Sequence, residues 1–408
     1  MRRWDVIVVG GGPIGAVAAR LAAGCGAHVA LLDRSETTDL PSPCTGLVSP
    51  RTLSALGVSE ASILRRIDAV EAVSPSGRTL RLQADEPRGL VLDRTHLRAE
   101  LHDRAREAGA EIFLGHEAVG LRPGHVEASG PGTVETMQAG VIVVAAGVQT
   151  NLQEAADLPT PPRPFVGVQA VVEDEAEQET AVRTFFGTET APRFFGWAVP
   201  AEEGRTRVGL AAPPGVDPNP LLDRHLARWF EGRRILSRVG GRLPLHPLSE
   251  PYADGLLFVG DAAGQLKPLT GGGLYTGAIC ARIAGRVSAE AARTDRTGAE
   301  DLRRYASDCD RAIGDEVRFG LAARALLESL SDEAIDDAFA AADHPDLLQF
   351  LATHGDIDRL RQLPRRLASR RNLWKRLVPL MSLLDRHLGA AQRFESSDAV
   401  AGFPDESL

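Results

Sequence analysis

The first 34 residues constrain the fold more than any other part of the chain. A short apolar run over residues 5–10 leads into Gly10, Gly12 and Gly15, and an Ala- and Leu-rich helical stretch follows. In a β-α-β unit such glycines allow a tight turn, close approach of the backbone to a pyrophosphate, and close packing of helix on strand. Asp33 ends the next apolar run, where a carboxylate can accept a hydrogen bond from a ribose hydroxyl. This pattern predicts dinucleotide binding, against the alternative of a glycine-rich turn in an unrelated α/β protein.

Both NAD and FAD would fit this unit, and a second motif favours FAD. An apolar run over 256–259 ends in Gly260 and Asp261 and opens a glycine-rich stretch. Asp261 could accept a hydrogen bond from a ribitol hydroxyl, which FAD has and NAD lacks; the alternative is a simple helix N-cap. A helix is expected after Gly273, with its N-terminal amides toward the pyrimidine edge of the flavin. The sequence contains no second GxGxxG, so no separate NAD(P)H domain is expected.

The coarse pattern predicts an α/β fold: a Rossmann-type FAD-binding domain with a β-rich substrate domain and a helical C-terminal region. We assign 1–160 together with 240–295 to a discontinuous FAD-binding domain. Alternating apolar and polar residues predict an antiparallel-sheet substrate domain over 161–239, with one covered face. Helical periodicity marks 296–408 as the C-terminal region.

Several motifs together resemble a known group of flavoproteins. GGGPIG at 10–15 and GDAAGQLKPLTGGGLYTGA at 260–278 resemble the superfamily of aromatic hydroxylases, flavin halogenases and geranylgeranyl reductases. PCTGLVS at 43–49, LDR at 92–94, and FGWAVP at 195–200 with a later Val-Gly pair resemble the geranylgeranyl reductase family in particular. The resemblance covers residues 1 to about 285. It departs from the family where Thr-Gly-Leu replaces three glycines after Cys44, and where Phe195 and Val199 replace Tyr and Phe.

The resemblance implies FAD as the cofactor and places individual residues around it. Arg94 is expected to contact FAD, Cys44, Thr45 and Leu47 to lie beside the flavin, and Val119 to present its backbone to the adenine. Arg34, which follows Asp33, could contact the adenine or, as the less favoured alternative, a 2′-phosphate. The predicted cofactor-binding residues are Gly10, Gly12, Ile14, Gly15, Asp33, Arg34, Cys44, Thr45, Leu47, Arg94, Val119, Asp261, Gly273 and Leu274.

The chemistry implied by the family predicts three further roles. Reduction of an unactivated C=C bond requires hydride delivery from reduced flavin, a proton donor and a dry channel for an isoprenoid tail. We predict catalytic roles for Cys44, as proton donor, and for Trp197 and Phe195, which alternate to one face of a strand and could line the channel. The alternative is that the two aromatic residues are sheet core and Cys44 is a small loop residue. The predicted activity is saturation of a geranylgeranyl-type lipid, diphosphate or quinone side chain.

Three other functions compete with this prediction. The main alternative is an FAD-dependent monooxygenase acting on a hydrophobic or aromatic small molecule; such hydroxylases usually carry Asp-Gly after the strand at 141–145, where this chain has Val144-Ala-Ala-Gly147. A halogenase would need an active-site lysine in the N-terminal half, and the first lysine here is Lys267. A sensory flavoprotein without turnover would use Cys44 and Trp197 for packing alone.

Composition limits the possible partners. A net charge of −9 argues against nucleic acid and against broad attachment to anionic lipid. The four cysteines lack metal-ligand spacing, so no metal is expected. Without a signal segment or a run of 18 apolar residues, a cytoplasmic location is expected. Basic and apolar residues mix at 366–381, which could touch a membrane surface or pack on the body. The sequence carries no motif for the electron donor.

Overall fold

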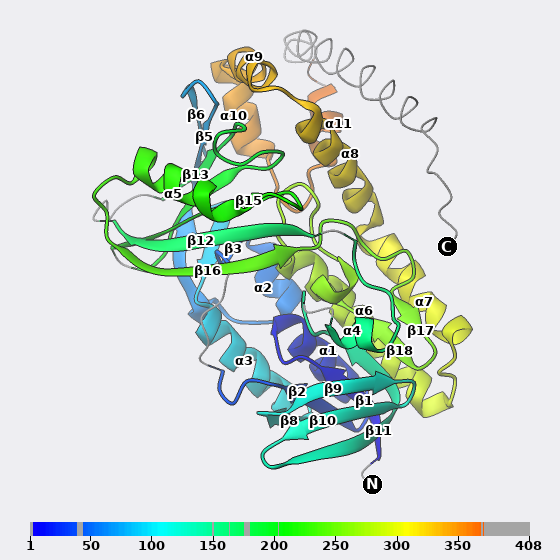
Figure 1. The fold of residues 1–408 in the computed structure, drawn as a ribbon. Helices are drawn as coiled ribbons and strands as arrows, with labels where there is room; N and C mark the ends of the chain where they lie inside the picture. The colour runs from blue at the N-terminus through cyan, green and yellow to red at the C-terminus, as the bar shows by residue number, and fades with distance from the viewer. Residues whose placement is uncertain are drawn as a thin grey trace, which may run out of the picture.

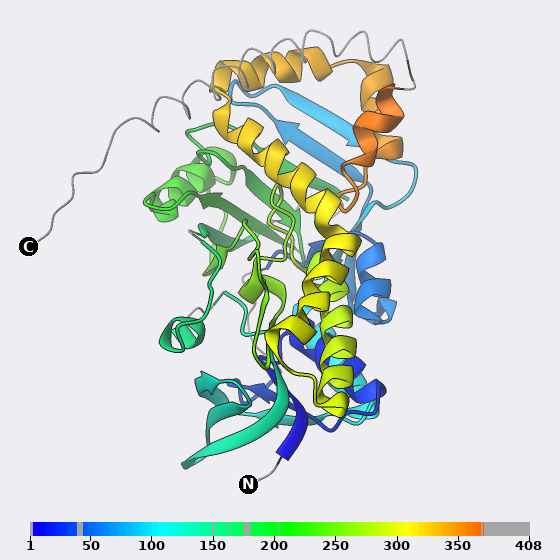
Figure 2. The same cartoon turned by 90° about the vertical axis from the view of Figure 1, so that its right-hand side faces the viewer.

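The computed structural model describes residues 3–38, 44–148, 151–162, 164–174, 180–202, 204–368 and 370. A mostly parallel sheet forms the lower part of the molecule in Figure 1, and a mostly antiparallel sheet forms the upper part. Helices of the C-terminal region run along one side of both sheets (Figure 2). The predicted fold class, α/β with a β-rich part and a helical C-terminal region, is confirmed.

The lower sheet has the Rossmann arrangement that the N-terminal pattern predicts. Its strands follow the order β17-β18-β11-β1-β2-β8, and β1 pairs in parallel with both β2 and β11. The hairpin of β9 and β10 continues from the long strand β11. The bounds are β1 (Arg3–Val9), β2 (Val29–Asp33), β8 (Glu111–Leu114), β9 (Glu117–Arg122), β10 (His125–Gly130), β11 (Thr133–Val144), β17 (Tyr252–Ala253) and β18 (Leu256–Phe258).

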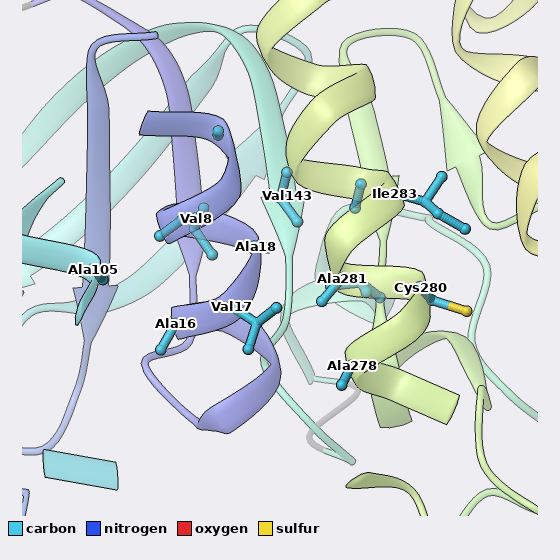
Figure 3. Packing of buried hydrophobic residues seen from close by; sticks show 14 of the residues in the cluster. Val8, Ala16, Val17, Ala18, Ala105, Val143, Ala278, Cys280, Ala281 and Ile283 are labelled. Carbon is cyan, nitrogen blue, oxygen red and sulfur yellow. The ribbon is translucent and has the colours of Figure 1, made fainter. Parts of the chain in front are cut away.

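Helices cover one face of this sheet and the hairpin covers the other, which is why its strands are apolar on both faces. The helices are α1 (Pro13–Gly24), α3 (Arg94–Glu107) and α6 (Leu274–Thr294). Figure 3 shows Val17 of α1 and Ala281 of α6 on the facing sides of the two helices. A Cβ on Gly285 would lie 2.5 Å from the Ala18 carbonyl oxygen, so α1 and α6 can pack this closely only because residue 285 is a glycine.

The upper sheet follows the order β16-β12-β15-β14-β13-β5-β6, and its neighbours are antiparallel except for β13 and β5. Helix α5 (Pro218–Trp229) packs on it through an apolar face. The bounds are β5 (Ala69–Val73), β6 (Thr79–Gln83), β12 (Phe165–Glu173), β13 (Ala181–Phe185), β14 (Gly196–Pro200), β15 (Arg205–Ala212) and β16 (Ile235–Leu243). The sheet expected within 161–239 is therefore wider than that range, because β5 and β6 belong to it; the division into domains stays a prediction.

A small third sheet contains the residues that follow Cys44 and ends just before Arg94, two residues that the sequence predicts to lie at the flavin. Its order is β3-β7-β4, all antiparallel. The bounds of this region and of the remaining short helices are β3 (Leu47–Val48), α2 (Arg51–Leu56), a 3-10 turn (Glu60–Ser62), β4 (Ile63–Ile67), β7 (Gly89–Leu92), α4 (Asn151–Ala155) and a second 3-10 turn (Gly260–Ala263).

The C-terminal helices form a column that rises from the lower sheet to the outer end of the upper sheet (Figure 2). There, Asp336 accepts hydrogen bonds from Ser74 and Ser76 of the β5–β6 turn. The elements are α7 (Ala299–Cys309), a π-helical stretch (Asp310–Gly314), α8 (Asp315–Ser329), α9 (Asp332–Ala342), α10 (Pro345–His354) and α11 (Gln362–Ala368). Most of the basic stretch at 366–381 lies outside the described residues. Within the described part of the chain, no helix is long and apolar enough to cross a membrane.

Candidate active site

The three motif glycines of the first turn have different structural roles. Gly10 has φ +105°, and a Cβ there would lie 2.4 Å from the Ala145 carbonyl oxygen. A Cβ on Gly15 would lie 1.8 Å from the Gly10 oxygen. A Cβ on Gly12 would meet nothing within 4 Å. Gly10 and Gly15 thus permit the turn and the packing, whereas Gly12 leaves open space before the N-terminus of α1, where backbone amides can bind an anion.

Asp33 is buried at the end of β2 and is held by two donors. Its Oδ1 accepts from Ser35 N at 2.8 Å, and its Oδ2 is paired with Arg98 of α3. A Cβ on Gly11 would lie 2.3 Å from Asp33 Oδ2, so the middle glycine of the turn makes room for this carboxylate. Ser35 and Arg98 thus hold the Asp33 carboxyl group at the position where the sequence predicts a ribose contact.

One face of α3 is directed toward the first turn and toward Asp261. Arg94, Arg98 and His102 follow each other at intervals of four residues and therefore share a helix face. The buried ring of His102 donates from Nε2 to the Gly11 carbonyl oxygen at 2.6 Å. Burial lowers the pKa of His102, so the ring is neutral at pH 7.

The second predicted motif brings Asp261, Arg94 and Gly273 together. A Cβ on Gly273 would lie 2.8 Å from Asp261 Oδ1. Burial raises the pKa of Asp261 to about 6, and the positive charge of Arg94 partly opposes this rise. The N-cap of α6 is Gly273 and that of the 3-10 turn is Val259, so Asp261 does not cap either helix by its side chain.

These residues fit an FAD molecule. Nε and Nη1 of Arg94 are buried without a hydrogen-bond partner among the described residues, and this is costly unless a ligand supplies an acceptor. The open backbone at Gly12 suits a pyrophosphate, and the Asp261 carboxyl suits a hydroxyl donor.

Residues 44–49, here called the Cys44 loop, form a compact turn that continues into β3 beside β7. Gly46 N donates to Cys44 Sγ at 3.4 Å, and Leu47 N donates to Thr45 Oγ1 at 3.2 Å. Gly46 has φ +75°, and a Cβ there would lie 2.6 Å from the Leu92 carbonyl oxygen. The loop therefore lies directly against the residues that precede Arg94. Pro43, which begins the family-like motif, lies outside the described residues.

Arg207 ties the Cys44 loop to the upper sheet. It projects from β15, where it is 9% exposed. Its Nη1 donates to the Thr45 carbonyl oxygen at 2.7 Å, and its Nη2 pairs with Glu202 at 2.7 Å. A buried cation in a central strand fixes the loop from the side of the predicted substrate domain.

Trp197 and Phe195 lie on the side of the upper sheet that meets this loop. Both are partly buried. Trp197 donates from Nε1 to Gln169 Oε1 at 3.1 Å and packs in the same cluster as Leu47. Phe195 stacks on Phe194 at a centroid distance of 4.6 Å, and its ring lies 6.3 Å from that of Trp197. Phe195 precedes β14, so the two aromatic residues are neighbours without belonging to one regular strand.

The glycine-rich loop at 264–273 meets the same aromatic cluster and is held by α8. A Cβ on Gly271 would lie 3.7 Å from Phe194 Cζ. Arg324, 2% exposed, donates to the carbonyl oxygens of Pro268 at 2.8 Å and Leu269 at 3.0 Å. Its guanidinium lies 4.4 Å from the centroid of Phe194.

Other predicted cofactor residues lie at the edges of this arrangement. Ile14 packs its side chain toward Gly260 and Gly277 of the α6 region, so only its backbone is free to face a cofactor. Arg34 is exposed after β2, and Val119 on β9 is 48% exposed. Leu274 begins α6 and packs on the core of the lower sheet. Their contacts with FAD stay predictions.

Sequence reasoning missed three buried basic residues of the site, His102, Arg207 and Arg324, and the partly buried Arg98. For Arg98 and His102 a signal existed, because their spacing from Arg94 places them on one helix face. Arg207 and Arg324 gave no local signal for this role, since the loop carbonyl oxygens that they bind, of Thr45 and of Pro268 and Leu269, lie far away in the sequence.

Comparison with known proteins agrees with this geometry. A family model described as FAD dependent oxidoreductase matches residues 50–287. A digeranylgeranylglycerophospholipid reductase of Methanothermobacter thermautotrophicus is 34% identical over 362 residues, which cover 85% of this chain and 93% of that protein.

Solved structures share the fold. A geranylgeranyl bacteriochlorophyll reductase-like protein from Thermoplasma acidophilum has a TM-score of 0.82 at 20% identity, over 94% of this chain and 100% of that one. A p-nitrophenol 4-monooxygenase from Pseudomonas putida has a TM-score of 0.68 at 18% identity, over 90% and 98%. At such identities the likeness concerns the fold alone, and the fold is shared by reductases and monooxygenases.

Proposed function

The chain belongs to the geranylgeranyl reductase family of FAD-dependent oxidoreductases, and from this membership we propose that it saturates C=C bonds of a geranylgeranyl-type prenyl lipid. FAD as cofactor and the enzyme class follow from the family. The substrate is the proposal, and the name of the Methanothermobacter relative supports a lipid that carries two geranylgeranyl chains on a glycerophosphate.

One observation carries the proposal: Leu47 of the Cys44 loop and Trp197 of the upper sheet pack in one apolar cluster. Together with Phe195, which stacks on the buried Phe194, these residues offer an apolar surface for a hydrocarbon chain. The same loop carries the Cys44 thiol, a group that can donate a proton. A polar or charged substrate would find few partners on such a surface.

The residues around the cofactor divide into two groups. Backbone amides at the N-terminus of α1, reached through the open space at Gly12, would hold the pyrophosphate, with Gly10 and Gly15 shaping the turn; Asp33 would hold the adenosine ribose. Arg94 and Asp261 would hold the ribityl side, with Gly273 at the start of α6. When bound, reduced FAD supplies the hydride for one carbon of the double bond.

The protein's own task in the reaction is to deliver a proton to the second carbon and to keep water away. In our proposal Cys44 donates that proton, and the Gly46 N–H, which bonds to its sulfur, stabilises the thiolate that remains. Arg207 keeps the loop in place through the Thr45 carbonyl. Trp197 and the apolar residues around it exclude water from the reacting bond.

The test is direct reduction without the natural donor. We would confirm bound FAD, reduce the protein anaerobically with dithionite, and add geranylgeranyl glycerophospholipid or geranylgeranyl diphosphate. Product mass should rise in steps of two hydrogens. If flavin stays reduced with both substrates and no saturated product forms, prenyl reduction is excluded; oxygen with an aromatic panel would then test the monooxygenase alternative.

A further inference from the structure

A buried carboxylate of the C-terminal region lies between the two loops that we expect to flank the flavin. The side chain of Asp358 is 0% exposed, and its Oδ1 accepts from Lys267 Nζ at 2.7 Å. Its Oδ2 accepts from Ser49 Oγ. Ser49 follows β3 at the end of the Cys44 loop, and Lys267 lies in the loop between Asp261 and α6. Asp358 thus bonds to both loops at once.

On one side, Lys267 controls the turn that leads into α6. Its backbone N–H donates to the Gly272 oxygen at 3.0 Å, and its oxygen accepts from Gly271 N at 2.8 Å. A Cβ on Gly272 would lie 2.9 Å from Lys267 Cε, so the lysine side chain lies across the turn. Because Gly273 follows at once as the N-cap of α6, the position of Lys267 sets where this helix begins relative to Asp261.

On the other side, Ser49 fixes the end of the Cys44 loop. It is 3% exposed, and its carbonyl oxygen accepts from Thr52 N at 3.0 Å at the start of α2. Only Leu47 and Val48 separate it from the turn that contains Thr45 and Gly46. A shift of Ser49 would therefore move the segment that we place beside the flavin.

We propose that Asp358 is a positioning residue for the flavin, which sets the separation of the Cys44 loop from the loop at 264–273. The proposal rests on the proposed function only in taking these loops as the walls of the FAD site. It assigns to the C-terminal region a specific task, because the residue that couples both walls comes from the segment between α10 and α11.

The burial of this contact favours a positioning role over a general stabilising one. Burying an ion pair removes two charges from water, and this cost often offsets the attraction between them, so such a pair contributes specificity of arrangement more readily than stability. The neighbouring pair of Asp356 with Arg51 differs, because those side chains are 25% and 50% exposed and the pair reaches α2 without reaching the loop at 264–273. The other oxygen of Asp356, Oδ1, accepts from the Asp358 backbone N–H at 3.0 Å, a hydrogen bond that the amide oxygen of an Asn at 356 can keep. Asp356 is therefore a matched control.

The experiment compares Asp358→Asn with Asp356→Asn. FAD is removed, the apoprotein is titrated with FAD by flavin fluorescence, and the visible spectrum of the rebound flavin is recorded. We expect Asp358→Asn to weaken FAD binding about tenfold and to change the spectrum, whereas Asp356→Asn stays within about twofold of the unmodified protein. A residue with a purely structural role would lower the melting temperature and leave both the affinity and the spectrum of the folded protein unchanged.

If Asp358→Asn does not fold, a less disruptive variant with its own control tests the same contact. Ser49→Ala removes one hydrogen bond and leaves the Lys267–Asp358 ion pair intact; Ser54→Ala, on the exposed side of α2, is its control. Weaker FAD binding in Ser49→Ala but not in Ser54→Ala supports the proposal, and unchanged binding in both Ser49→Ala and any folded Asp358→Asn overturns it. The readout is FAD affinity, so a protein that fails to reduce prenyl lipids still decides this question.

Discussion

The indole ring of Trp197 lies against Gly209, the residue directly opposite it in β15. A Cβ on Gly209 would lie 2.6 Å from both Cε2 and Cζ2 of the indole. The Val-Gly pair that accompanies the FGWAVP motif therefore has a physical reason: the glycine provides the space that the tryptophan ring occupies.

This relationship predicts the effect of Gly209→Ala. The added methyl group must displace the indole and would also lie 2.6 Å from the Val168 carbonyl oxygen, at a cost of about 1–3 kcal/mol in the free energy of unfolding. If Trp197 lines the prenyl channel, kcat/KM should fall about tenfold and the preferred chain length should change. Gly240→Ala in β16 is the control, because its Cβ would meet no atom closer than 3.4 Å. Unchanged chain-length preference in a folded Gly209→Ala protein would remove Trp197 from the substrate site.

The first turn predicts opposite effects for two adjacent glycines. Gly11→Ala should destabilise the apoprotein by about 1–3 kcal/mol, because the methyl group would collide with the Asp33 carboxylate. Gly12→Ala should leave apoprotein stability nearly unchanged, because its methyl group points into open space, yet weaken FAD binding about tenfold or more. Thermal unfolding without FAD and FAD titration separate the two. Equal FAD affinity of Gly12→Ala and the unmodified protein would contradict the pyrophosphate assignment.

Asp261 should favour cofactor binding at the expense of apoprotein stability. Burial raises the pKa of Asp261 from 3.8 to about 6, so the folded apoprotein binds this proton more tightly than the unfolded chain and loses the resulting stability as pH rises through 6. Between pH 4 and pH 7.5 the free energy of unfolding of the unmodified apoprotein should therefore fall by roughly 2 kcal/mol relative to that of Asp261→Asn.

The same variant should bind FAD about tenfold more weakly, since the amide replaces a charged acceptor. Denaturant titrations at both pH values measure the first effect, with the exposed Asp85→Asn as control. A gain in stability without loss of FAD affinity would indicate that Asp261 has no contact with the cofactor.

His225 should make the protein sensitive to acid. It is 3% exposed, and burial lowers its pKa from 6.5 to about 4, with Arg183 and Arg228 adding to the effect. The folded protein favours the neutral ring. The contribution of His225 to the free energy of unfolding is therefore complete above pH 6.5, and roughly 3 kcal/mol of it is lost as the pH falls from 6.5 to 4.

His225→Phe should flatten this part of the stability curve, because phenylalanine has no proton to gain and can keep the contact with Phe185. The exposed His96→Gln should leave the curve unchanged. Denaturant unfolding at pH 7, 5.5 and 4.5 gives the curve; if His225→Phe has the same slope as the unmodified protein, other groups govern the acid response.

Cys44 should matter for turnover, because we propose its thiol as the proton donor. Loss of a proton donor typically costs about 10²-fold in rate, so Cys44→Ala should lower kcat by that order with little change in KM. Cys25→Ala, at the end of α1, is the matched control. Full turnover in Cys44→Ala with dithionite-reduced flavin would show that another group, or water, supplies the proton.

The sequence by itself determined the dinucleotide-binding unit, the helix that starts after Asp93 and the fold class, because each depends on local patterns. Glycines at fixed spacing, strands buried on both faces and an Asp N-cap are all written in short stretches of chain. The tertiary structure alone decided what surrounds these features. Arg98 on Asp33, Arg207 on the Cys44 loop, and Asp358 between Ser49 and Lys267 join residues from 65 to 309 positions apart. A buried charge gains its partner only when distant elements pack together, and no local periodicity records that partner.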